Sequence, residues 1–201
     1  MSLPDFFINP VVQLLAQTSS PYDVPADPEI FSENWLEPVL TRSLALLREA
    51  NPQEHAPASA TGSGLTYLAL TSDVEKDYAV HLRIAGEGEA VPRDPAEKSV
   101  VLTLGGTMEL EAFRHGGDVD ADTPWYVRQF APENIYACHP GTLHSVEQSE
   151  DAVQLVISRG ATPAVGRSLS VEEYRLAADR AQHLLGHVLE SRGGAVAQIS
   201  S

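Results

Sequence analysis

The sequence predicts a mainly β fold, in which one barrel of short antiparallel strands lies between helices at both ends of the chain. Three observations predict it. Short β-rich runs recur at regular spacing between residues 65 and 158, apolar residues recur at helical spacing before residue 50, and a helix-start signal precedes an apolar stripe after residue 170. We therefore expect a helical extension over 1–64, a barrel over 65–160 and a C-terminal helix and tail over 161–201.

The barrel strands are bounded by turn residues. Gly105-Gly106 is the clearest turn, and it predicts a two-residue hairpin because glycine adopts positive φ values without steric cost. The runs predicted as strands are Leu65–Thr71, Tyr78–Ile84, Ser99–Leu104, Thr107–Phe113, Trp125–Phe130, Ile135–Cys138, Thr142–Gln148 and Val153–Ser158.

Two helices have readable ends. The first begins near Glu37 and stops before Asn51-Pro52, because a residue that precedes proline disfavours the helical conformation. The second begins at Ser170, where Ser170-Val-Glu-Glu173 has the spacing of a capping box, and we expect it to end at Gly193-Gly194.

Composition excludes several classes of partner. The 201 residues carry a formal net charge of −15, which would repel nucleic acid and anionic membranes. Cys138 is the only cysteine, so an internal disulfide is impossible, and no apolar run reaches the length of a membrane span. We expect a cytoplasmic protein that binds a small molecule, with a homodimer as a possible assembly.

The segment from Tyr136 to Gln148 is the most informative part of the sequence for function. His144 follows a Pro-Gly turn at the start of a strand, and strand alternation places Thr142, His144, Val146 and Gln148 on one face. This arrangement points an imidazole into the mouth of a small barrel.

That segment resembles the second motif of the cupins, which are double-stranded β-helix (jelly-roll) barrels. The matching residues are His139-Pro-Gly141-Thr-Leu-His144, with Gln148 where the motif has asparagine. Within the cupins, the chain is most similar to the cysteine (thiol) dioxygenases, through Tyr136 before Leu143-His144-Ser-Val-Glu147, Gly86-Glu-Gly88, and Ala152-Val153. The resemblance covers about residues 65–160 and implies a cupin barrel with an Fe(II) site.

The sequence departs from the cupin pattern at the metal ligands. The resemblance places the paired histidines of the first motif at Arg93 and Pro95 and the carboxylate at Ser99, and none of these is a plausible ligand. The assisting His and Tyr of the last strand fall on Val156 and Ser158. Only His144 remains, so we expect no metal cofactor.

The main alternative is an active iron-dependent oxygenase with non-standard Fe(II) ligands. His81, His144 and one of Glu97, Glu109 or His139 would then have to converge. A further alternative is a non-catalytic dimeric interaction module formed through the terminal helices.

Five residues are candidates for the site. His144 is the catalytic candidate, as an acid/base or hydrogen-bonding group, and a metal ligand only if a metal binds. Arg93 could hold a carboxylate, although a solvated loop residue is the favoured interpretation. Tyr136, Gln148 and His81 are candidates for substrate binding, but for His81, as for Arg83, a solvent-facing strand face is slightly favoured.

Two further features favour ordinary structural roles. We interpret Cys138 as a small buried apolar group, because no partner set for a nucleophile is recognisable. His183 and His187 have a zinc-chelating spacing on the last helix, but an exposed helical face explains them better.

Overall fold

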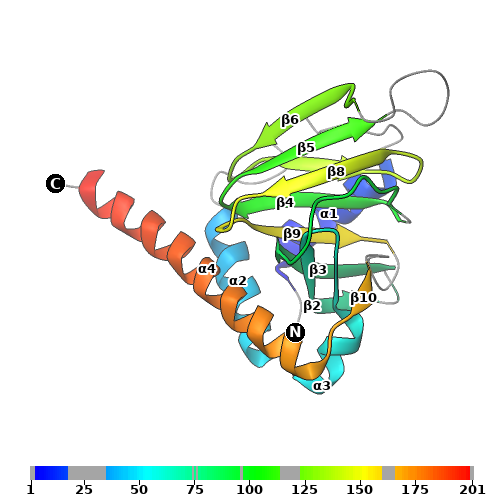
Figure 1. Cartoon of the computed structure of the whole chain (residues 1–201). Coiled ribbons are helices and arrows are strands. Elements are labelled where there is room, and N and C mark those ends of the chain that lie inside the picture. Colours follow the sequence, from blue (N-terminus) through cyan, green and yellow to red (C-terminus); the bar gives the residue numbers. More distant parts are fainter. Residues whose placement is uncertain are drawn as a thin grey trace.

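The computed structural model describes residues 3–17, 35–73, 75, 77–95, 97–113, 123–159 and 166–199. Two antiparallel sheets face each other, and helices cover the outer face of the larger one (Figure 1). The larger sheet has seven strands in the order β10-β1-β2-β3-β9-β4-β7. Their bounds are β1 Ala60–Gly62, β2 Leu65–Asp73, β3 Tyr78–Ala85, β4 Ser99–Gly105, β7 Ile135–Cys138, β9 Val153–Ser158 and β10 Arg167–Ser168.

The smaller sheet contains β6 (Tyr126–Phe130), β5 (Met108–Phe113) and β8 (Leu143–Gln148), in that order. An isolated antiparallel bridge between Arg93 and His144 adds a fourth chain segment beside β8. Strands distant in sequence pair across the barrel, with β3 beside β9 and β4 between β9 and β7. This pairing confirms the predicted fold class, a mainly β jelly-roll barrel with helices at both ends.

The helices are α1 (Asp5–Gln17), α2 (Leu36–Glu49), the short α3 (Pro52–His55) and 3-10 helix η2 (Ala56–Ala58), and α4 (Val171–Ile199). α2 and α4 contact each other, and the C-terminal part of α4 extends away from the barrel (Figure 1). None of the described helices combines the length and apolar character needed to cross a bilayer.

The larger sheet is buried on both faces, which divides the core in two. The outer cluster joins helices to sheet and includes Phe7, Leu40, Leu82, Leu155 and Leu185. The inner cluster fills the barrel between the sheets and includes Tyr67, Val101, Met108, Tyr136 and Cys138. A strand in such a sheet has no solvent-exposed face, so its polar residues lie in the interior as well.

β3 shows the consequence and corrects one expectation. Val80, Leu82 and Ile84 pack toward the helices, while His81 and Arg83 lie on the opposite face, only 1% and 2% exposed. The alternation on this strand therefore separates two buried environments. The surface position slightly favoured for His81 and Arg83 is wrong.

The eight predicted strands are all present, with boundaries shifted by at most two residues. The capping box is confirmed, because the Glu173 amide donates to Ser170 Oγ (3.2 Å) and the Ser170 amide donates to Glu173 Oε2 (2.8 Å). Glu173 also pairs with Arg167.

Both glycine pairs behave differently from expectation. Gly106 has a φ of +65°, but β4 and β5 belong to different sheets, so Gly105-Gly106 crosses between sheets and is not a hairpin. α4 continues past Gly193-Gly194 to Ile199, because glycine keeps its amide and can extend a helix at a cost of about 1 kcal/mol relative to alanine.

Candidate functional site

Arg83 is the most unusual residue of the barrel interior. Its Nε donates to Gln154 Oε1 (2.7 Å) and its Nη1 to the Tyr67 hydroxyl (3.4 Å). Its Nη2 donates to the Tyr136 hydroxyl and lies 3.7 Å from Met108 Sδ. Each of the three guanidinium nitrogen atoms thus contacts at least one acceptor in the barrel interior.

All four of these partners are electrically neutral. Burial raises the pKa of Tyr136 above its ordinary value even though the Arg83 guanidinium favours the phenolate, so the hydroxyl stays protonated at neutral pH. No carboxylate of the described residues forms an ion pair with Arg83. A charge without a counter-ion in a protein interior costs several kcal/mol, so this environment favours an added anion.

Arg93 brings a second guanidinium to the same place. Its Nη2 donates to the Tyr67 hydroxyl (2.6 Å), so Tyr67 accepts from both arginines. The Arg93 Nη1 is buried and has no hydrogen-bond partner among the residues that the structure describes. The side chain is half-buried and bonded to the interior, which corrects the favoured interpretation as a solvated loop residue.

Gln148 lies on the inner face of the small sheet together with His144, as strand alternation predicts. The neighbours Met108, Leu110 and Ala112 pair with Gln148, Val146 and His144 respectively, and all three belong to the inner cluster. The Gln148 Nε2 donates to Gln154 Oε1, the atom that also accepts from Arg83. Gln148 is therefore two hydrogen bonds from Arg83.

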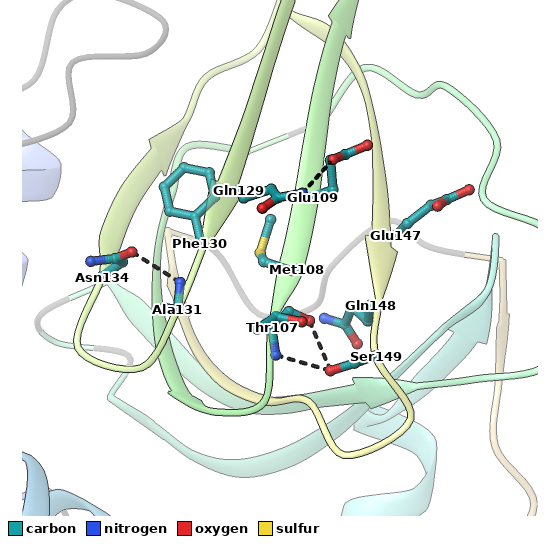
Figure 2. Close-up of a pocket in the computed structure, with 10 residues that line it drawn as sticks. All are labelled: Thr107, Met108, Glu109, Gln129, Phe130, Ala131, Asn134, Glu147, Gln148 and Ser149. Carbon is teal, nitrogen blue, oxygen red and sulfur yellow. Dashed lines mark hydrogen bonds between the residues drawn. The ribbon is translucent and has the colours of Figure 1, made fainter.

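A cavity of about 390 Å³ approaches this network from the Gln148 end of β8 (Figure 2). Met108 and Gln148 belong to both the cavity lining and the Arg83 network. The remaining lining comes from the ends of β5, β6 and β8 and adjoining turns: Thr107, Glu109, Gln129, Phe130, Ala131, Asn134, Glu147 and Ser149. The cavity thus reaches neutral groups that contact the buried cation.

His144 and Cys138 meet at the other end of β8. The Cys138 Sγ lies 3.7 Å from His144 Nε2, and the His144 Nδ1 lies 3.0 Å from the Thr142 carbonyl oxygen. A carbonyl oxygen can only accept, so Nδ1 carries a proton and Nε2 faces the thiol. Cys138 is buried, as expected, but it is a hydrogen-bonding partner of the histidine and not only an apolar filler.

The charges around this pair favour its ionised form. Burial alone would raise the pKa of Cys138, but His144, with Arg83 and Arg93, lowers it below its ordinary value. Burial alone would lower the pKa of His144, but the Cys138 thiolate and the Thr142 carbonyl raise it. Arg93 opposes the positive ring but also favours the thiolate, so the two pKa shifts bring the thiol and the imidazole closer to sharing one proton.

His81 occupies a separate environment. It shares a strand face with Arg83, but its Nε2 lies 3.3 Å from the Ala58 carbonyl oxygen, and it lines a different cavity beside α2, α3 and η2. Burial lowers its pKa to about 4. Among the described residues, no hydrogen bond joins His81 to His144.

The residues of the interior do not fit an iron site. Glu97 is exposed, and Glu109 lies on the outer face of β5, where it accepts from Gln129. Across the described ranges, no three His, Cys, Asp or Glu side chains gather as a metal-binding group. One imidazole and one thiol do meet, those of His144 and Cys138. They lie near the guanidinium groups of Arg83 and Arg93, whose positive charge disfavours a bound metal cation.

Sequence reasoning missed most of this network. Tyr67 and Gln154 belong to no motif, and the sequence around Arg83 and Cys138 predicts ordinary structural roles. The available signal was an arginine that stands between two apolar residues, Leu82 and Ile84, near the end of a strand. That signal becomes informative only when both faces of β3 are known to be covered.

Comparison with known proteins gives a likeness in shape only. No protein-family model matches the chain, and no curated protein matches its sequence. Among solved structures, the chain is similar to hydroxypropylphosphonic acid epoxidase from S. wedmorenis in complex with fosfomycin (11% identity, 55% of this chain and 57% of that chain, TM-score 0.40).

Two other solved structures have comparable values. They are KdgF from Halomonas sp. (14% identity, 50% of this chain and 83% of that chain, TM-score 0.38) and the ribosomal oxygenase YcfD from Escherichia coli with cobalt and 2-oxoglutarate (17% identity, 43% and 24%, TM-score 0.34). The chain spans 58% of the iron(II) form of HppE, at 11% identity and a TM-score of 0.42. Likenesses of this size transfer no activity or ligand to this chain.

Proposed function

We propose that this chain is a diverged, cysteine-dioxygenase-like cupin that binds a small anionic molecule inside its barrel and does so without the usual iron site. The observation that carries the proposal is the Arg83 guanidinium, which is 2% exposed and surrounded by neutral partners only. A bound anion supplies the missing counter-charge.

Arg93 supports the same conclusion from an independent position. Its buried Nη1 has no partner, while its Nη2 shares the Tyr67 hydroxyl with Arg83. Unpartnered donors of a guanidinium fit the oxygen atoms of a carboxylate or phosphate. The ligand class is therefore a small molecule with one such group, held between two cations that Tyr67 keeps in place.

The direct test is ligand-dependent thermal stability. At constant ionic strength, acetate, malonate and phosphate are compared with neutral acetamide, and hits are confirmed by calorimetric titration. An anion that binds the folded state raises Tm as its concentration passes Kd. We expect at least one anion to raise Tm and acetamide to leave it unchanged.

Variants locate the effect. Arg93→Gln removes one cation and should weaken anion binding about tenfold or more, since charge-assisted hydrogen bonds contribute about 1.5–3 kcal/mol. Arg180→Gln is the matched control, because Arg180 bonds only the Ala85 and Glu150 carbonyl groups in an exposed position. Equal anion binding by Arg93→Gln and the native chain would contradict the proposal.

An active iron oxygenase with non-standard ligands is the competing function. It requires near-stoichiometric iron after anaerobic titration with ferrous ion and desalting, measured by elemental analysis. The anion proposal expects trace iron and the same anion affinity before and after the titration. Stoichiometric iron that is lost in His144→Ala would favour the oxygenase instead.

A further inference from the structure

The proposed anion binding gives no role to the contact between Cys138 and His144. The two residues come from consecutive strands, β7 and β8, which the turn 139–142 joins. That turn is fixed by the Gly141 amide, which donates to Asp94 Oδ1 (2.7 Å), and by the Thr142 hydroxyl, which donates to the His139 carbonyl. Hydrogen bonds therefore hold the turn that brings Cys138 and His144 together.

The orientation of the imidazole suits activation of a thiol. Because the Thr142 carbonyl holds the Nδ1 proton, the atom that faces Cys138 Sγ at 3.7 Å is Nε2. In its neutral form Nε2 can take the thiol proton, and the positive ring that results stays beside the thiolate. A base that is itself oriented by a third group is the arrangement that nucleophilic cysteines require.

A second, independent feature points to a ligand at this end of the barrel. Ser99 pairs with Cys138 on one side and with Ser158 on the other, so the three residues form one row across β7, β4 and β9. Ser158 is 5% exposed, and within the described part of the chain its buried Oγ has no hydrogen-bond partner. Because Val156 belongs to the inner cluster, alternation directs Ser158 into the barrel.

The arginines of the anion site belong to the same surroundings. Arg93 is bridged to His144 through the backbone, and Arg83 and Arg93 both favour negative charge on Cys138. An anionic ligand bound by these two cations would therefore lie close to the sulfur. Binding of an anion requires only the two guanidinium groups. The thiol, the oriented imidazole and the unpartnered hydroxyl beside them indicate a further, chemical role.

We propose, resting on the anion site above, that Cys138 is a nucleophile assisted by His144 and that the ligand class is a small carboxylate with an electrophilic carbon. In the reaction the Cys138 sulfur supplies the electron pair for a new S–C bond. The leaving group departs with the electrons of the bond it breaks, and the thiol proton remains on His144 Nε2. No oxidant or reductant is consumed.

Two small alkylating reagents that differ mainly in charge test this directly. Iodoacetate and iodoacetamide each transfer their carbon to a thiolate with release of iodide, but only iodoacetate carries a carboxylate. Cys138 is the only cysteine of the chain, so intact mass measures its modification without ambiguity. We expect iodoacetate to modify the native, full-length chain about tenfold faster or more, because a positive site concentrates an anion.

Three variants assign the effect. His144→Gln should slow both reagents, because it removes the base. Arg93→Gln should remove the preference for iodoacetate while iodoacetamide still reacts. Arg180→Gln should retain the native rates and preference, because Arg180 lies outside the barrel interior. Circular dichroism and Tm show that each variant is folded before its rates are compared.

The outcomes separate this inference from the proposed function. If acetate raises Tm but neither reagent modifies the native chain, the proposal that Cys138 is a nucleophile is wrong and the proposed anion site remains. If the two reagents modify Cys138 equally fast and no anion binds, the anion site and the carboxylate ligand class are both overturned. Modification that occurs only in urea also overturns the nucleophile, whereas protection of Cys138 by acetate supports both.

Discussion

The backbones of Arg93 and His144 are hydrogen-bonded in both directions: the Arg93 amide donates to the His144 carbonyl (2.8 Å) and the His144 amide donates to the Arg93 carbonyl (2.9 Å). This bridge places a guanidinium beside the strand that carries the histidine, at the position where the cupin resemblance expects a metal ligand. A positively charged side chain thus lies where the resemblance expects a metal ligand, which supports the proposed binding of an anion.

Tyr67 accepts hydrogen bonds from both arginines, so its hydroxyl should be important for stability. Tyr67→Phe leaves a charged donor of Arg93 and one of Arg83 without that acceptor, and we expect a loss of about 1–3 kcal/mol in the free energy of unfolding. Urea denaturation measures it. Tyr174→Phe is the control, because the buried Tyr174 hydroxyl has no hydrogen-bond partner in the described ranges and its removal should be neutral.

His81 should make stability depend on pH. Its pKa is about 4 in the folded chain and 6.5 ordinarily, so between these values the unfolded chain binds a proton that the folded chain does not. Stability therefore falls as pH falls from 6.5 to 4, by about 3 kcal/mol at the lower end.

The substitution His81→Gln tests this contribution, because glutamine can still donate to the Ala58 carbonyl but does not titrate. Unfolding free energies measured between pH 4 and 7 should vary less steeply in this variant. His183→Gln, in an exposed position of α4, should keep the native dependence. A profile of His81→Gln that matches the native one would assign the slope to other groups.

The capping box of α4 should contribute measurably to stability. Ser170→Ala removes the hydroxyl that accepts from the Glu173 amide, and we expect a loss of about 1 kcal/mol. Thermal and urea unfolding both report it. Ser191→Ala should have little effect, since the Ser191 hydroxyl donates only to the Val188 carbonyl within the same helix.

Gly106 should resist substitution. Its φ is +65°, and a Cβ there would lie 2.5 Å from the Ala152 Cα, so Gly106→Ala should lose more than about 1 kcal/mol. Gly186 in α4 has open space around an added Cβ, and Gly186→Ala should gain about 0.5–1 kcal/mol because alanine has the higher helix propensity. Opposite signs in one unfolding experiment would confirm that backbone conformation decides the effect.

The sequence by itself determined the local structure of this protein. The strand boundaries, the start of α4 at its capping box and the inward direction of His144 and Gln148 follow from turn residues and from alternation along one strand. These features depend on residues close together in the chain, so short stretches of sequence suffice to predict them.

Only the tertiary structure decided which residues meet in the barrel. The alternation on β3 has the same form whether its polar face meets water or another sheet, so Arg83 could not be recognised as buried from its own strand. Cys138 and His144 meet through a turn geometry, and Arg83 meets Tyr67 and Tyr136 across strands. The physical reason is that the burial of a residue depends on which layers cover the two sides of the sheet. The alternation of side chains along a strand shows only which side each residue faces.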